Sequence, residues 1–143
     1  MNNPNETQIG GTHYNSSYQH WDFVYDVYRG RYLESSISKY VVRWRKKNGV
    51  QDLLKAKHYT QKLIDLFLVG RIEPISSVDA LDRSSNFLRF VRANSLIWTE
   101  EEIVRRLATW QDTYDLQRVV YLIDLLSQLL PGEAPSPAYV NQD

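Results

Sequence analysis

The segment KYVVRWRKKNGVQDL, residues 39–53, joins two amphipathic patterns and so decides the fold. Before its turn, apolar side chains recur at i, i+3, i+4 and i+7, which is typical of one face of a helix, here over residues 34–47. Those side chains are Ile37, Tyr40, Val41 and Trp44. Asn48-Gly49 favours a left-handed stop to that helix, and the acid Asp52 suits the first turn of the next one. A turn this short predicts an antiparallel helical hairpin.

The same helical spacing recurs along most of the chain, and we predict an all-α fold. A short aromatic helix is expected at residues 20–28, and the second hairpin helix ends at Gly70. After Glu73-Pro74 we expect a C-terminal set of about three helices. The first is capped by Ser76 or Ser77, and its apolar residues are Val78, Leu81, Leu88 and Val91. The second begins with a capping box of Thr99 and Glu102, and its apolar period consists of Ile103, Leu107, Trp110 and Tyr114. The apolar residues of the third are Leu116, Val119, Val120, Ile123, Leu126 and Leu130.

These patterns divide the 143 residues into four expected parts. They are a polar arm with the motif GGTHY at 1–19, a helical region at 20–70, a C-terminal helical region at 71–131 and a Pro-rich tail at 132–143. The chain has no cysteine, no apolar run of the roughly 18 residues that a membrane span needs, and no secretory signal pattern at its start. We therefore expect a cytoplasmic protein without a membrane partner.

Charge is the property that points to function. The chain has 17 basic and 17 acidic residues, yet residues 39–62 contain eight basic residues and one acid, which is +7, so the remainder carries −7. Like charges on neighbouring helical turns repel each other, so folding alone gives little reason for this cluster. A general nucleic-acid binder is usually basic overall. A local patch in a neutral chain instead indicates a compact anion such as a nucleotide.

The basic side chains fall into two stripes that are predicted to flank one groove. Lys39, Arg43 and Lys46 are spaced by i, i+4 and i+7 on the first hairpin helix, and Lys55, Tyr59 and Lys62 have the same spacing on the second. Arginine and lysine bind phosphate, and aromatic rings stack on bases, so Tyr40 or Tyr59 and Trp44 are expected to contact the base or shape the groove. The alternative is a solvated charged face, which is the expectation for Arg45, Lys47 and Lys57.

Other kinds of site are poorly supported. The glycines of IGGTHY, residues 9–14, could form an anion-binding nest next to His13 and Tyr14, although such a pair is more often a flexible turn. The spacing of the three histidines matches no zinc pattern. The chain has no P-loop motif, and no nucleophile–base–acid series stands out. We therefore expect no metal and no cofactor, apart from magnesium arriving with a nucleotide if the protein is a kinase.

Three stretches resemble a phage family that is often described as a domain of unknown function. They are GGTHY, HWDF and SISKYVVRWRKKNGVQDLLKAKHY, and the resemblance covers roughly residues 8–66. A described relative is a T-odd phage nucleotide kinase that lacks a P-loop. The resemblance implies a phage protein that is expressed in a bacterial cytoplasm and deals with nucleotides, with residues 20–70 as its helical nucleotide-binding region. From about Gly70 onward no counterpart is evident. The matching positions are His13, Tyr14, Lys39, Tyr40, Arg43, Lys46, Asp52, Lys55 and Tyr59.

Three functions remain open at this point. The leading hypothesis is a homo-oligomeric phage protein that binds a small phosphorylated nucleotide without turnover, for example to sequester a cyclic nucleotide used in host defence. The second is a kinase that transfers a phosphoryl group to a nucleoside monophosphate, since positioning and electrostatics do most of the work in such reactions. The third is a non-enzymatic interaction protein for a host partner or a short nucleic acid. The acidic remainder of the chain could also simply neutralise the basic patch.

Overall fold

A computed structural model describes residues 17–74 and 84–129, and within these ranges every regular element is helical. The all-α prediction is confirmed there. The helices are α1 (His20–Phe23), a π-helical turn (Val24–Tyr28), α2 (Tyr32–Arg43), α3 (Val50–Leu68), α5 (Ser84–Ala93), α6 (Trp98–Thr109) and α7 (Thr113–Ser127). The expected helix start at Ser76 or Ser77 lies outside the described residues.

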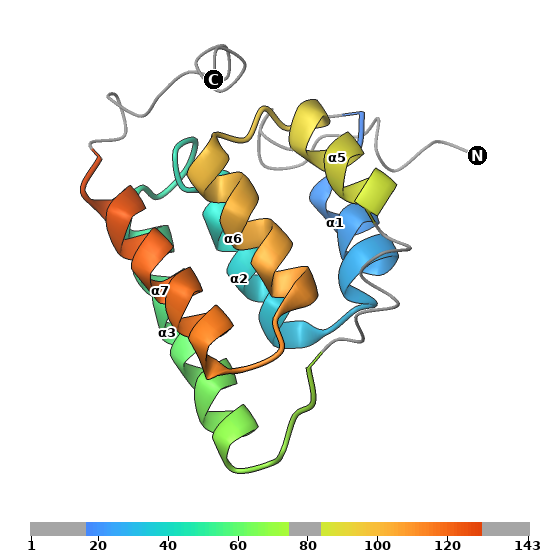
Figure 1. The fold of residues 1–143 in the computed structure, drawn as a ribbon. Coiled ribbons are helices and arrows are strands. Elements are labelled where there is room, and N and C mark those ends of the chain that lie inside the picture. Colours follow the sequence, from blue (N-terminus) through green and yellow to red (C-terminus); the bar gives the residue numbers. More distant parts are fainter. Residues whose placement is uncertain (1–16, 75–83, 130–143) are drawn as a thin grey trace.

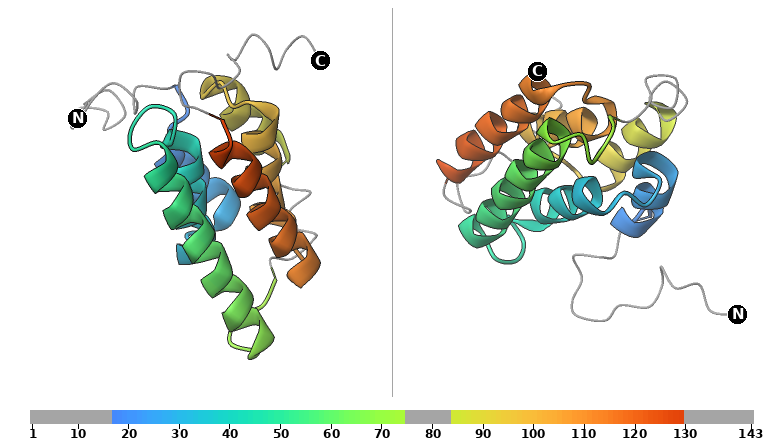
Figure 2. Two further views of the ribbon diagram at one scale, coloured as in Figure 1. Left: turned by 90° about the vertical axis from the view of Figure 1, so that its left-hand side faces the viewer. Right: turned by 90° about the horizontal axis from the view of Figure 1, so that it is seen from below.

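Four of these helices form a closed ring around the hydrophobic core. α2 packs on α3, α3 on α7, α7 on α6, and α6 back on α2. Figures 1 and 2 show α2 and α3 as one layer and α6 and α7 as the other. The predicted hairpin therefore does not stand alone, because the C-terminal helices cover its apolar face. Its buried side chains, such as Ile37 and Leu63, belong to the same core cluster as Ile103 and Leu122.

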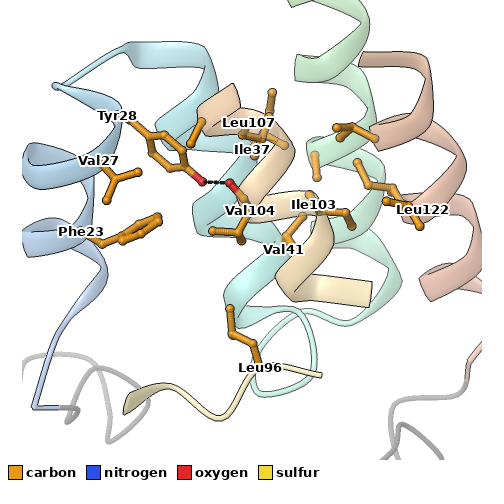
Figure 3. Close-up of a cluster of buried hydrophobic side chains, with 14 of the residues drawn as sticks. Phe23, Val27, Tyr28, Ile37, Val41, Leu96, Ile103, Val104, Leu107 and Leu122 are labelled. Carbon is orange, nitrogen blue, oxygen red and sulfur yellow. Dashed lines mark hydrogen bonds between the residues drawn. The ribbon is translucent and has the colours of Figure 1, made fainter. Parts of the chain in front are cut away.

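α1 and α5 extend the core at one end through aromatic packing. The rings of Phe23 and Phe90 stack with centroids 4.1 Å apart. The hydroxyl of Tyr28 donates a hydrogen bond of 2.9 Å to the carbonyl oxygen of Val104 on α6 (Figure 3). On α5 the core residues are Phe87 and Phe90, whereas Leu88 is half exposed. Leu88, one of the apolar residues predicted for this helix, is therefore not a core residue.

α2 ends at Arg43, four residues before the predicted Lys47, and residues 44–49 form the turn to α3. The reason is tertiary: Trp44 is fully buried and Arg45 reaches across to Glu100 on α6, so this part of the chain turns inward. Gly49 completes the turn with φ 58° and ψ −134°, a combination that essentially only glycine adopts. The predicted turn at Asn48-Gly49 is thus present, with its helix stop moved upstream.

Two buried tryptophan–glutamate pairs connect α2 and α6 at opposite ends. The indole N–H of Trp44 donates to Glu100 Oε2 at 2.7 Å, and the indole N–H of Trp110 donates to Glu34 Oε2 at 3.1 Å. All four side chains are fully buried. Because one tryptophan follows α2 and the other follows α6, the two helices run antiparallel and are joined at both ends.

The predicted capping box of Thr99 and Glu102 is not the one that forms. α6 begins at Trp98, and the N–H of Ile97 donates to Glu100 Oε1 at 3.0 Å. The helix begins earlier because Glu100 is held inward by its partners on the α2–α3 turn. α6 also ends before Tyr114, which lies instead in the first turn of α7 and is 72% exposed.

Candidate functional site

The ring of Tyr40 is the centre of a cationic cluster on the outer face of α2 and α3. Lys39 Nζ lies 4.9 Å from the ring centroid, Arg43 Cζ 4.9 Å and Lys55 Nζ 5.5 Å. These distances are within the range of cation–π attraction. The helical hairpin explains the arrangement, because Lys39 and Arg43 flank Tyr40 on α2 and the antiparallel α3 presents Lys55 to the same ring. We call Lys39, Tyr40, Arg43 and Lys55 the cationic cluster.

Two further tyrosines extend the aromatic surface away from the cationic cluster. The ring centroid of Tyr59 on α3 lies 5.7 Å from that of Tyr40 and 6.4 Å from that of Tyr32 at the start of α2. Tyr59 is half-buried and Tyr32 is exposed. The three rings therefore form a row that runs along the hairpin. Tyr32 was not among the predicted site residues, because sequence spacing gave no reason to connect it to Tyr59.

Asp52 supports the cationic cluster from beneath. Its side chain is fully buried, and its Oδ1 accepts from Arg43 Nη2 at 3.3 Å. The backbone N–H and the side-chain amide of Asn48 also donate to this carboxylate, at 3.3 and 3.4 Å. Asp52 thus holds Arg43 and the turn in place, and it is covered from solvent.

Lys46 and Trp44, the remaining predicted residues that the structure describes, are not brought into the cationic cluster. Lys46 is exposed in the turn, without an ion pair or a ring contact to any described residue. His13 and Tyr14 lie outside the described residues. Trp44, which was expected to contact the base or shape the groove, is fully buried and therefore does not face a ligand.

Two of the basic residues that were expected to be solvated are instead paired with acids from the C-terminal half. Arg45 donates to Glu100 through Nε at 2.9 Å and Nη2 at 2.8 Å. Lys57 Nζ lies 3.0 Å from Asp124 Oδ1 on α7. The acidic half therefore neutralises part of the basic patch. Within the described ranges no acid pairs with Lys39, Lys46, Lys55 or Lys62, so these charges stay available.

His20 is a neighbour of the cationic cluster that sequence reasoning considered only as a metal ligand. Its Nε2 lies 2.9 Å from the hydroxyl oxygen of Ser38, the residue before Lys39. Burial and, secondly, the charge of Lys39 lower the pKa of His20 to about 4. The imidazole is therefore neutral near pH 7. In the part of the chain that the structure covers, no group of three His, Asp or Glu side chains is arranged to hold a metal ion.

A wide cleft of about 1120 Å³ adjoins the row of tyrosines. It lies between the first turn of α2 and the C-terminal half of α3, and Tyr32 and Tyr59 form part of its wall. At its inner end Arg31 pairs with the buried Glu34 at 2.7 Å and donates to the carbonyl oxygen of Glu73 at 2.8 Å. The cleft was not predicted, because it forms only when residues 71–73, beyond the end of α3, lie beside the first turn of α2. Its other lining residues are Leu33, His58, Gln61, Lys62, Asp65, Leu66, Arg71 and Ile72.

Comparison with known proteins gives a match to a family model of unassigned function, and it covers the segment that holds the cationic cluster. Residues 9–61 match the model of a family described as protein of unknown function (DUF3310). This match covers less than half of the chain, yet it contains all of α2, most of α3 and the whole cationic cluster. No curated protein and no solved structure shows a significant match. None of the helices in the described ranges has the length and apolarity needed to cross a membrane.

Proposed function

We propose that this protein binds a small phosphorylated nucleotide at the cationic cluster and releases it unchanged. The observation that carries the proposal is the convergence of Lys39, Arg43 and Lys55 on the ring of Tyr40, from two helices. Like charges held this close repel each other unless an anion joins them. Asp52 offsets only one of the three positive charges, so a phosphate held between the cationic groups would gain from the other two.

The chemistry of the three cations fits a phosphate group. Arginine offers a planar fork that matches phosphate oxygens, and lysine a mobile point charge. Because Asp52 holds Arg43 on one side, the guanidinium is oriented before a ligand arrives, which lowers the entropy cost of binding. The two lysines are exposed and rest against an aromatic face, so they can turn to a ligand without breaking an ion pair.

The position of Asp52 supports binding without turnover. Phosphoryl transfer uses magnesium that carboxylates hold on the nucleotide phosphates. Asp52 is fully buried, and its oxygens accept from Arg43 and Asn48. It therefore serves to position Arg43. Sequestration of a nucleotide used in host defence by a phage protein would be one consequence of tight binding without turnover, and it belongs to the same proposal.

Calorimetry with the full-length chain tests the proposal. The ligands are nucleoside mono-, di- and triphosphates and cyclic mono- and dinucleotides, each titrated at low salt with magnesium. We expect saturable binding of at least one of them. Each sample is then incubated with ATP, heat-denatured and chromatographed, and we expect the ligand to be recovered intact. A newly phosphorylated product would show a kinase instead. Preference for oligonucleotides with steep salt dependence would show a nucleic-acid binder.

A matched pair of lysines on α3 tests the location of the site. Lys55→Ala removes a cation of the cluster, whereas Lys57→Ala, two residues further on, removes a cation that pairs with Asp124. Both variants lose one charge from the same helix. We expect Lys55→Ala to cost about 1.5–3 kcal/mol of binding, as for hydrogen bonds to charged groups, and Lys57→Ala to cost little. Equal losses in the two variants would refute the site and leave only a general effect of charge.

A further inference from the structure

The cleft beside the cationic cluster differs from it in charge. Its lining combines three basic side chains, Arg31, Lys62 and Arg71, with three acidic ones, Glu34, Asp65 and Glu73. The cluster itself is predominantly positive. A phosphate would be attracted to the cluster and would meet acids in the cleft. From this contrast we infer that the cleft holds the uncharged part of the nucleotide, the base and sugar, while its phosphate lies at the cluster. This inference rests on the proposed function.

The aromatic row joins the two places and sets how the ligand would lie. Tyr59 forms part of the cleft wall, and its ring centroid is only 5.7 Å from that of Tyr40 at the cluster. Tyr32 continues the row into the cleft, 6.4 Å beyond Tyr59. A base stacks on aromatic rings irrespective of its identity, because every base has a π-face. A nucleotide whose phosphate is held by the cations around Tyr40 would therefore place its base against Tyr59 and Tyr32.

The walls of the cleft also suit a nucleoside. Leu33, Leu66 and Ile72 supply apolar contact for the flat base. Gln61 and His58 offer hydrogen-bonding groups for the base edge or the sugar hydroxyls. Pockets for small molecules typically combine an apolar lining with a few polar groups in about 300–1,000 Å³. At about 1120 Å³ the cleft is large enough for a base with its sugar.

Two exposed tyrosines provide the test. Tyr32 lines the cleft and is 70% exposed, whereas Tyr114 on α7 is 72% exposed and is not part of the cleft lining. Neither contributes to the buried core, so we expect Tyr32→Ala and Tyr114→Ala to stay folded, which circular dichroism and thermal melts check. The probes are AMP, GMP, CMP and UMP, together with inorganic phosphate, each titrated against the full-length parent and the two variants.

If the inference is correct, Tyr32→Ala weakens binding of the nucleotides about 5- to 150-fold, the range for losing one stacking ring. Tyr32→Ala leaves the weaker binding of inorganic phosphate unchanged. Tyr114→Ala changes neither the affinity for nucleotides nor the affinity for phosphate. Lys55→Ala, by contrast, weakens both kinds of probe. If Tyr32→Ala binds nucleotides as tightly as the parent while Lys55→Ala binds them more weakly, the cleft is not the nucleoside site, and the cationic cluster remains the phosphate site. If neither nucleotide nor phosphate binds the parent, the proposed function itself fails.

Discussion

Replacing Glu100 with alanine is expected to lower the free energy of unfolding by about 3–5 kcal/mol, the usual cost of removing one partner from a buried ion pair. The carboxylate is fully buried and accepts four hydrogen bonds: from the Trp44 indole at 2.7 Å, from Arg45 at 2.9 and 2.8 Å, and from the Ile97 N–H at 3.0 Å. Its loss leaves the Arg45 guanidinium, only 15% exposed, without its carboxylate.

Urea unfolding followed by circular dichroism measures this effect. With an m-value of about 1–3 kcal/mol per molar for a small protein, the midpoint should fall by more than about 1 M. Glu100→Gln keeps an acceptor oxygen and should lie between the parent and Glu100→Ala. The control is Glu102→Ala on the same helix, whose partly exposed ion pairs with Arg106 and Arg118, at 3.2 and 3.4 Å, should be worth less than about 1 kcal/mol each.

A double-mutant cycle with Arg45→Ala separates the reasons for the loss. If the cost comes from an uncompensated arginine, the double variant is less destabilised than the sum of the two single variants. The reasoning is refuted if Glu100→Ala unfolds within about 1 kcal/mol of the parent, or if Glu102→Ala is the more damaging change.

Three further outcomes follow from single positions. The pKa of His20 falls from 6.5 in the unfolded chain to about 4 in the folded one, so the unfolded state binds more protons between these two pH values. The contribution of neutral His20 to the free energy of unfolding should therefore be fully present above pH 6.5 and decline toward pH 4. Urea midpoints of His20→Gln, measured over this pH range, should lack that decline. Gly49→Ala should cost about 1–3 kcal/mol of unfolding free energy, because φ 58° with ψ −134° is strained for alanine; an unchanged midpoint would contradict this. Trp44→Ala should lower the free energy of unfolding by about 3–5 kcal/mol. Leu54→Ala, at a 60% exposed position, should change it by no more than about 0.5 kcal/mol in the same assay. Equal losses in the two variants would contradict the burial of Trp44.

The cationic cluster shows how far local patterns reach. Lys39, Tyr40 and Arg43 are neighbours on one helix, so the 3.6-residue period alone places them side by side. Lys55 and Tyr59 joined them once the short turn predicted an antiparallel partner. Each of these steps needs only contacts close in sequence, and for that reason the residues themselves predicted them.

The errors at Arg45 and at the beginning of α6 share a different cause, because each of them involves a partner far along the chain. Arg45 was expected to be solvated, and its acceptor Glu100 lies 55 residues away. The same carboxylate caps α6 at Ile97 and also accepts from Trp44 and Arg45, just after the early end of α2. Because those two partners are 56 and 55 residues away, local capping rules gave no reason to prefer Glu100 to Glu102.

The sequence by itself determined the helical class, the hairpin and the composition of the cationic face, because hydrophobic period, turn residues and local charge act over a few residues. Only the tertiary structure decided which charges stay available and where a cleft opens. Packing α6 and α7 against the hairpin buried Trp44 and paired Arg45 and Lys57 with acids, but left Lys39 and Lys55 facing solvent around Tyr40. The physical reason is that burial and ion pairing depend on contacts between helices that are far apart in the sequence, and these contacts form only when the whole chain is folded.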